Sequence, residues 1–276
     1  MEKFPYIEAG SYLFRFLDHR TEYFWPAIGD MLSEQALFLN SRRNFNDPYD
    51  SQPLIINDLS SHAIRHYFDE AMQNPYNPKR SLGGIARILE MKANDRTHLT
   101  KKHIDNIKDG QRKNAEKILD SADLLSFSLT AENPLLWGHY AASFAGICVV
   151  FKRGGSLSSG LSLCAKVTYV DKRPQLPLSL IHEMTERRMA NEPYDEFAKK
   201  IFFLSFLHKS NYWAYEHEAR IFYPFHAFKK LPFESSELVG FILGPNSSRI
   251  FEKKNERRNK EASSLDEFGT SNFVPE

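Results

Sequence analysis

The sequence predicts an α+β fold with a single mixed, mostly antiparallel sheet and helical insertions. Short runs of aliphatic, β-branched and aromatic residues, which favour strands, recur at uneven intervals along the 276 residues. Helical segments of unequal length separate these runs, whereas a doubly wound fold needs a regular alternation of strand and helix. With 42% hydrophobic residues, the chain can also bury a core of its own.

Six or seven strands are expected in this sheet. The first, residues 11–17 (SYLFRFL), is mainly aromatic and aliphatic and carries a single cation, Arg15. Residues 146–152 (GICVVFK) form a nearly continuous apolar run, which is typical of a central strand. The other expected strands are residues 36–40, 123–129, 165–170, 218–223 and 238–243.

Residues 1–250 are expected to form one domain with a polar helical insertion at residues 60–120, which packs against the sheet. The charges of this insertion are those of a solvated helix face. Residues 251–276 are rich in charged side chains and predict a charged helix or tail. Further helices are expected at residues 22–34, 134–141 and 181–207, the last interrupted near Pro193.

The composition argues against several classes of protein. A net charge of +1 disfavours binding to nucleic acid through bulk charge. No run reaches the roughly 18 apolar residues of a membrane span, and no signal peptide is evident, so a cytoplasmic protein without a membrane partner is expected. The two cysteines lie in expected strands and predict buried thiols. The spacing of histidines and cysteines predicts no metal site.

Residues 207–224 (LHKSNYWAYEHEARIFYP) hold the densest group of chemically useful side chains. Two carboxylates, Glu216 and Glu218, lie two positions apart and follow several aromatic residues. Two acids placed between aromatic residues and a core strand indicate a specific structural or functional role. Two cations and an aromatic residue flank them: Lys209, Trp213 and Arg220.

Local geometry brings the flanking residues toward the acids. A helix that continues past Trp213 would place Lys209 and Glu216 on the same face as that residue. A strand that begins near Glu218 would place its side chain and that of Arg220 on one face, because side chains alternate along a strand.

The paired acids allow two interpretations. In the first, one of them pairs with Arg220 or Arg15 in a buried clamp, which fixes geometry but adds little net stability. In the second, one carboxylate faces a pocket while the other is clamped, and the split environments tune the pKa of the first.

Two further regions place polar residues among apolar ones. Arg15 is interpreted either as an edge cation that reaches water or as a fixed partner for a carboxylate or phosphate. Residues 41–50 (SRRNFNDPYD) predict a rigid loop. This loop makes either a tight turn or a site to which Asn46 and Asp47 contribute.

The block NPLLWGHYAASFAGICVVF supplies a fourth candidate region. His139 and Tyr140 are suited to proton transfer or to contact with a substrate. A single histidine before a core strand is more often a structural residue, so both interpretations stay open.

Four stretches together resemble a known family: SYLFRFL, ALFLNSRRNFNDPYD, NPLLWGHYAASFAGICVVF, and HKSNYWAYEHEARIFYP with LVGFILG. In this order they closely resemble a widespread bacterial family, domain of unknown function 2971. The resemblance runs from about residue 12 to residue 244, and its motifs are specific together and weak singly. It implies a cytosolic prokaryotic protein of a family in which some members are associated with phage defence.

The layout is also similar to that of ADP-ribosyltransferases that use NAD. Those enzymes carry an Arg or His, then a Ser or Tyr, then a late Glu. Arg15, Ser41 and the pair Glu216 and Glu218 follow this order. The similarity implies that the cation grips NAD, the hydroxyl supports the nicotinamide and a Glu stabilises positive charge at the anomeric carbon. The Ser-Thr-Ser triplet of such enzymes is absent, and three residues stand as substitutes: Ser41, Ser126 and Ser128.

The leading hypothesis is therefore an enzyme with a nucleotide ligand, a transferase or glycohydrolase for which NAD is the substrate. The competing hypothesis is a non-catalytic sensor or partner-binding module of a defence or toxin system. A third is a nuclease with Mg²⁺ bound by Asp47, Asp50 and Glu218. The expected catalytic residues are Glu218, Glu216 and His139. The expected ligand-binding residues are Arg15, Ser41, Asn46, Asp47, Tyr140, Trp213 and Arg220.

Overall fold

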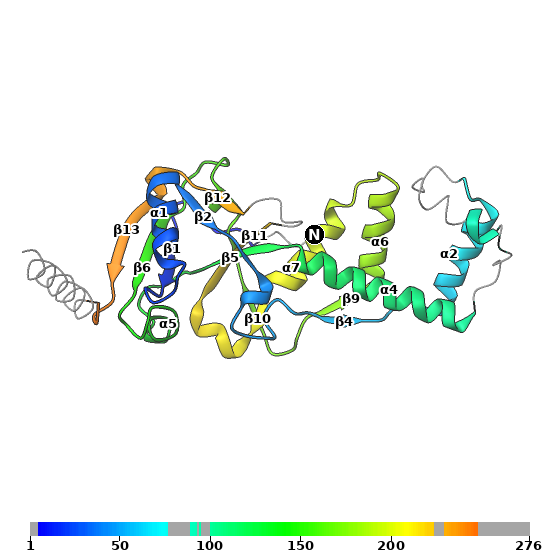
Figure 1. Cartoon of the computed structure of the whole chain (residues 1–276), viewed down its shortest axis with the longest axis horizontal. Coiled ribbons are helices and arrows are strands. Elements are labelled where there is room, and N and C mark those ends of the chain that lie inside the picture. The colour runs from blue at the N-terminus through cyan, green and yellow to red at the C-terminus, as the bar shows by residue number, and fades with distance from the viewer. Residues whose placement is uncertain (1–4, 77–88, 93, 95–99, 224–228, 248–276) are drawn as a thin grey trace, which may run out of the picture.

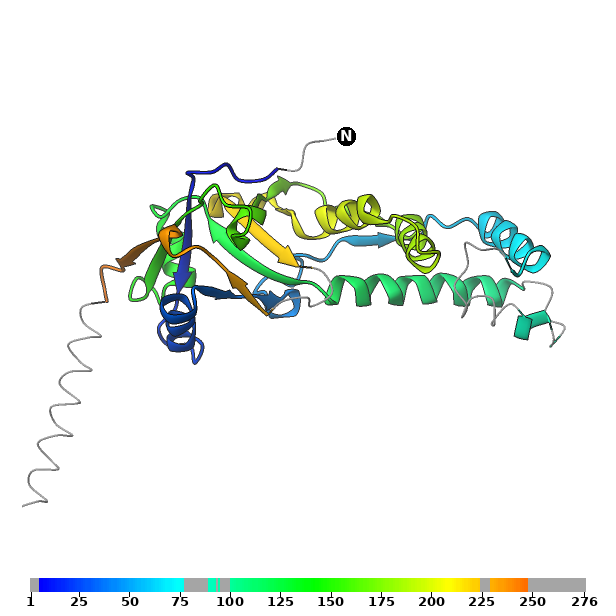
Figure 2. The ribbon, with the colours of Figure 1, turned by 90° about the horizontal axis from the view of Figure 1, so that it is seen from above.

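The computed structural model describes residues 5–76, 89–92, 94, 100–223 and 229–247. The molecule is elongated, with a β-sheet toward one end and helices that extend away from it toward the other (Figure 1). Seen at right angles, α4 (Lys101–Asp120) runs along one side of this helical part and α6 (Leu178–Met189) along the other (Figure 2). The expected α+β fold is confirmed.

The central sheet has seven strands, and every neighbouring pair in it is antiparallel in the described part of the chain. The order is β13, β6, β1, β5, β11, β7, and β3 pairs with the first two residues of β5. The strands are β1 (Tyr12–Leu17), β3 (Asn40–Ser41), β5 (Asp123–Ser128), β6 (Ile147–Lys152), β7 (Ala165–Lys166), β11 (Glu218–Tyr223) and β13 (Leu238–Leu243).

Side chains alternate along these strands, so the sheet has two different faces. On one face, Leu13 and Ala219 belong to a hydrophobic core with other inward residues of the sheet. On the other face, Phe222 packs against a second core that is largely helical. Glu218 and Arg220 share this second face with Phe222, as the alternation predicts.

The helical part encloses the second core. One hydrophobic cluster joins residues of α2 (Ser61–Gln73), α4, α6 and α7 (Asp195–Phe206) to Leu124 of β5. The expected insertion 60–120 thus supplies helices that pack against the sheet, and helices from a later part of the chain join them. Two shorter helices lie near the sheet: α1 (Phe24–Gly29) and α5 (Pro134–Tyr140).

Among the described residues, three two-stranded ribbons lie outside the main sheet, and the sequence did not predict them. Each of their strands has only three residues, too few for a periodic pattern to show. As a result, the expected strands 36–40 and 165–170 each divide between the main sheet and a ribbon. The ribbons are parallel β4 (Leu54–Ile56) with β9 (Gln175–Pro177), parallel β8 (Thr168–Val170) with β10 (His208–Ser210), and antiparallel β2 (Ala36–Phe38) with β12 (Lys230–Pro232).

The single helix that would continue past Trp213 does not form. The chain leaves α7 at Phe206, makes β10, and then turns into a short 3-10 helix, Asn211–Glu216. The side chain of Ser210 accepts the N–H of Tyr212 at 3.5 Å and so begins the new helix. Pro193 separates α6 from α7, as expected. The expected charged segment 251–276 lies outside the described residues.

Candidate functional site

A tight reversal brings Glu216 and Glu218 into one buried cluster. Glu216 ends the 3-10 helix, His217 has a left-handed φ of 46°, and Glu218 begins β11. Each of the two glutamates is only 5% exposed. Both therefore face the interior, where the same ammonium group, that of Lys209, contacts their carboxylates.

Arg220 is fully buried and holds two carboxylates at once. Its Nε and Nη2 lie 2.6 and 2.8 Å from the two oxygens of Glu218. Its Nη1 and Nη2 lie 2.7 and 2.5 Å from the two oxygens of Asp50. Nη1 also donates to the Ser51 hydroxyl at 3.1 Å and to the Phe206 carbonyl at 3.0 Å. Only the planar fork of an arginine fits two carboxylates in this way.

Lys209 connects the three acids of this cluster. Its Nζ lies 2.5 Å from Glu216, 3.1 Å from Glu218 and 3.3 Å from Asp50. It also lies 5.0 Å from the ring centroid of Trp213, a cation–π distance. Within the described residues, no group of His, Cys, Asp and Glu is suited to a metal ion. Two side-chain cations, Lys209 and Arg220, pair with the three acids instead. We call Asp50, Lys209, Glu216, Glu218 and Arg220 the ion network.

Glu216 is the member of the ion network that is linked to the surface. The Tyr140 hydroxyl donates to Glu216 Oε1 at 2.7 Å, and Asn46 Nδ2 donates to the same hydroxyl at 3.2 Å. Asn46 is exposed and Tyr140 is half-buried. His139 is exposed, with its ring 6.2 Å from that of Tyr140 and 6.4 Å from that of Tyr215.

The pKa values of the two glutamates shift in opposite directions. Burial raises the pKa of Glu216, and the charge of Lys209 only partly opposes this. Burial alone would raise the pKa of Glu218 too, but Arg220 and Lys209 lower it to about 2. Burial and the nearby Glu216 raise the pKa of Tyr140, so this phenol remains a proton donor. Glu218 therefore stays ionised down to low pH. Glu216 takes up a proton at a higher pH than an ordinary glutamate does.

Arg15 lies on the opposite face of the sheet from the ion network. Phe14 is paired with Ser128, and Ser128 with Glu218, so Arg15 points to the other side. There its Nη1 donates to the Ser126 carbonyl at 3.2 Å, and burial lowers its pKa to about 10. Because β1 and β5 are paired at a single position, this bond satisfies a carbonyl where the two strands diverge.

Two more expected ligand-binding residues make local contacts in the loop. The Ser41 hydroxyl accepts the N–H of Arg43 at 3.4 Å, at the start of a 3-10 turn. Asp47 accepts the N–H of Tyr49 at 2.8 Å, which is a turn of the Asx type. The expected site residues that the structure brings together are Asn46, Tyr140, Trp213, Glu216, Glu218 and Arg220, with His139 beside Tyr140.

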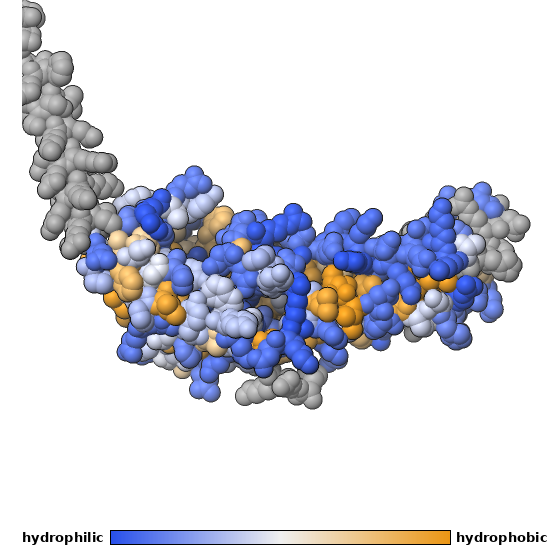
Figure 3. All heavy atoms as spheres, turned by 90° about the horizontal axis from the view of Figure 1, so that it is seen from below, coloured by the Kyte–Doolittle hydropathy of each residue, from blue (hydrophilic) through white to orange (hydrophobic). Residues whose placement is uncertain are grey.

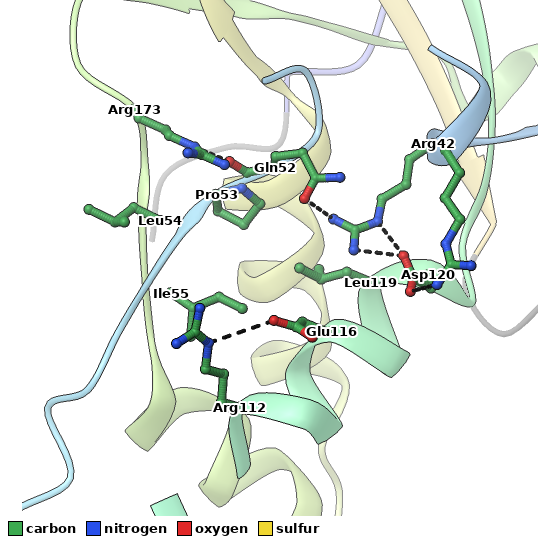
Figure 4. Close-up of a pocket in the computed structure, with 11 residues that line it drawn as sticks. Arg42, Gln52, Pro53, Leu54, Ile55, Arg112, Glu116, Leu119, Asp120 and Arg173 are labelled. Carbon is green, nitrogen blue, oxygen red and sulfur yellow. Dashed lines mark hydrogen bonds and ion pairs between the residues drawn. The ribbon is translucent and has the colours of Figure 1, made fainter. Parts of the chain in front are cut away.

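A cleft of about 420 Å³ was not predicted from the sequence (Figure 4). Arginines that line it come from positions 42, 43, 112 and 173, so no local spacing could reveal it. In the sequence, the adjacent pair Arg42 and Arg43 was the one available signal of this cleft. We call the cleft the arginine cleft. It is lined by Arg42, Arg43, Gln52, Pro53, Leu54, Ile55, Arg112, Glu116, Leu119, Asp120 and Arg173.

Asp120 is the internal counterion of the arginine cleft. Arg42 Nε and Nη2 lie 2.9 and 2.7 Å from its Oδ1, and Arg43 Nη2 bonds its Oδ2. Burial raises the pKa of Asp120, but the two arginines outweigh burial and lower it. Arg112 approaches Glu116 at 3.7 Å. The cleft therefore contains four guanidinium groups and two carboxylates.

Ser51 joins the arginine cleft to the ion network. Its carbonyl accepts from Arg42 Nη1 at 2.9 Å, and its hydroxyl accepts from Arg220 Nη1 at 3.1 Å. The hydroxyl also donates to Asp50 Oδ1 at 3.1 Å. Ser51 is 1% exposed and has a left-handed φ of 56°, which costs a residue with a Cβ some strain. The two sites therefore share one constrained residue.

A scan of protein-family models, a search of curated proteins and a search of solved structures found no match to this chain. The resemblance to domain of unknown function 2971 and the similarity to ADP-ribosyltransferases remain predictions. Within the described residues, no helix is both long and apolar enough to cross a membrane.

Proposed function

We propose that this chain is a non-catalytic binding module whose ligand is an anionic small molecule held in the arginine cleft. The observation that carries the proposal is the excess of positive charge in the cleft, where four guanidinium groups accompany two carboxylates. Small-molecule sites have volumes of about 300–1,000 Å³, and the cleft, at about 420 Å³, falls in this range.

The ion network supports a binding role more than a catalytic one. A general acid or base has to come within hydrogen-bond reach of its substrate. Glu216 and Glu218 are each 5% exposed and bonded to other members of the network. In this proposal the network is the rigid support of the cleft, because Arg220 holds Ser51 and Ser51 holds Arg42.

The test is native mass spectrometry of the protein incubated with a cell extract and then desalted. The double variant Arg43→Gln/Arg112→Gln removes two cations from the cleft. The matched control, Lys199→Gln/Lys200→Gln, removes two exposed cations from α7, outside the lining residues. We expect an anionic small molecule to stay bound to the wild type and the control and to be lost from the cleft variant. Equal retention by all three proteins, or none by the wild type, would contradict the proposal.

An enzyme that acts on NAD is the second candidate function. The hydrogen-bonded chain from exposed Asn46 through Tyr140 to Glu216 favours it, because it links a carboxyl of raised pKa to the surface. In this alternative, Tyr140 meets the substrate and Glu216 exchanges its proton. Arg15 has no part in it, since it lies on the other face of the sheet.

A further inference from the structure

The charge of the arginine cleft matches that of a phosphate monoester. Four arginines against one aspartate and one glutamate leave a formal charge of +2 (four minus two). A phosphate monoester has its second pKa near 6 and is mostly a dianion at neutral pH. Resting on the proposed binding function, we infer that the ligand is a mononucleotide: a phosphate dianion joined through a sugar to a flat ring.

Arg43, beside Asp120, and Arg112, beside Glu116, are two separate candidates to bind the phosphate. Their side chains are 70% and 66% exposed. A guanidinium has five N–H donors. In the described structure, the guanidinium of Arg43 bonds Asp120 through Nη2, and Arg112 meets Glu116 at 3.7 Å, beyond hydrogen-bond length. Both guanidinium groups therefore keep donors for phosphate oxygens, which they match in a two-point geometry.

Arg42 supports the phosphate site without offering many donors. Its Nε and Nη2 contact Asp120, and its Nη1 donates to the Ser51 carbonyl and to Gln52 Oε1, at 2.9 and 3.0 Å. It is 6% exposed. Arg42 is therefore a positioning residue that adds positive charge and holds Asp120 in place.

The apolar wall of the arginine cleft suits the flat ring of a base. It combines one proline with aliphatic side chains from β4 and α4, and an apolar surface of this kind packs well against a flat ring. Leu54 is 46% exposed. On the face seen in Figure 3, hydrophobic side chains gather in the part of the molecule where β4 and β9 lie, with hydrophilic ones around them. The wall residues are Leu54 and Ile55, which reach the surface, and Pro53 and Leu119, which are buried.

The size of the cleft favours a mononucleotide over NAD. Its volume of about 420 Å³ is close to the lower end of the range for small-molecule sites. One ring and one phosphate fit this volume better than the two rings and two phosphates of a dinucleotide. Inorganic phosphate, in turn, would leave the apolar wall uncovered.

The test is isothermal titration calorimetry with the four common ribonucleoside 5′-monophosphates. Their parent nucleosides, inorganic phosphate and NAD are the comparison ligands. We expect at least one monophosphate to bind at least about tenfold more tightly than its nucleoside, inorganic phosphate or NAD. Arg43→Gln/Arg112→Gln should weaken its binding at least about tenfold, and Lys199→Gln/Lys200→Gln should leave it unchanged.

Asp120→Asn supplies a variant that is expected to gain affinity. Asp120 is an anion inside the cleft, so its neutralisation removes repulsion of the phosphate and should tighten monophosphate binding.

No binding of any monophosphate, equal binding of the nucleoside, or equal weakening in the α7 control would overturn the mononucleotide inference. If mass spectrometry then finds another anion in the cleft, the binding proposal stands and only the ligand class is wrong. If it finds none, both fail.

Discussion

Arg42 and Arg220 donate hydrogen bonds to the same residue, Ser51, one to its carbonyl and the other to its hydroxyl. Arg42 lines the arginine cleft, and Arg220 lies at the centre of the ion network. The two charged sites are therefore mechanically joined through a single buried residue, and a change in one is expected to be felt in the other.

Substitution of Ser51 tests how much its hydroxyl bond to Arg220 and its left-handed backbone affect stability. Ser51→Ala removes the hydroxyl that accepts from Arg220 but keeps a Cβ at a left-handed φ. Arg220 keeps its other acceptors, so we expect a loss of about 1–2 kcal/mol in the free energy of unfolding. Ser51→Gly should lose less, because glycine adopts this conformation without strain. Urea unfolding measures both, and a larger loss in Ser51→Gly than in Ser51→Ala would contradict this account.

Arg220 should not be replaceable by lysine. A lysine ammonium cannot reproduce the two-point contacts to both Glu218 and Asp50, so buried carboxylate oxygens would be left without donors. We expect Arg220→Lys to lower the free energy of unfolding by about 3–5 kcal/mol, as for other broken buried ion pairs. Arg188→Lys, at an exposed position on α6, is the control. An effect of Arg220→Lys as small as that of the control would show that the network contributes little.

The low pKa of Glu218 predicts how stability depends on pH. An unfolded glutamate titrates near about 4.3, and the folded pKa is about 2. The stabilisation from ionised Glu218 is therefore complete above about pH 4.3 and is lost as the pH falls toward 2. The difference in unfolding free energy between wild type and Glu218→Gln should shrink over this window. A constant difference for Glu218→Gln would refute the assignment.

Binding of a nucleoside monophosphate should strengthen as the pH rises from 5 to 7. The phosphate gains its second negative charge near pH 6, while the lowered pKa of Asp120 keeps that carboxylate ionised throughout. We expect the affinity to rise severalfold, following the ligand rather than the protein. Calorimetry at three pH values checks this, with the nucleoside as a pH-independent control. A flat profile for the monophosphate would argue against recognition of the dianion.

The alternative enzyme function makes a separate prediction about NAD. If Glu216 and Tyr140 act on a substrate, the wild type should consume NAD, and Glu216→Gln and Tyr140→Phe should each lose most of that activity. Glu216→Gln should also shift the pH profile of the reaction, which a purely structural role would not do. Product analysis by chromatography measures the rate. Equal NAD loss with and without wild-type protein would remove this candidate.

Much of the sheet and part of the ion network could be predicted from the sequence because they depend on short-range periodicity. The six-residue strands of the main sheet are long enough for their apolar runs to be recognised. Alternation correctly placed Glu218 and Arg220 on one face. Lys209, Trp213 and Glu216 do meet, although a strand and a 3-10 helix bring them together instead of one helix.

Relations between distant segments could not be predicted in this way. Alternation along β1 tells which neighbours share a face with Arg15. It does not tell how β1 is aligned with the strand that carries Glu218, so the sequence could not show that Arg15 lies on the opposite face. Asp50 meets Arg220 across 170 positions, and nothing in the local pattern of either residue selects the other. The arginine cleft was missed for the same reason.

The contact between Asp50 and Arg220 can form only after both residues have been synthesised, which delays this part of folding on the ribosome. At synthesis rates of about 5–20 residues per second, Arg220 is made roughly 10–30 s after Asp50, since 170 positions separate them. Strand β1 likewise pairs with β6, for which more than a hundred further residues must first be made. The amino-terminal segment is thus complete long before its partners exist. Until those partners are made, its apolar side chains cannot be buried against them, and we expect the segment to be exposed to proteases and chaperones during synthesis.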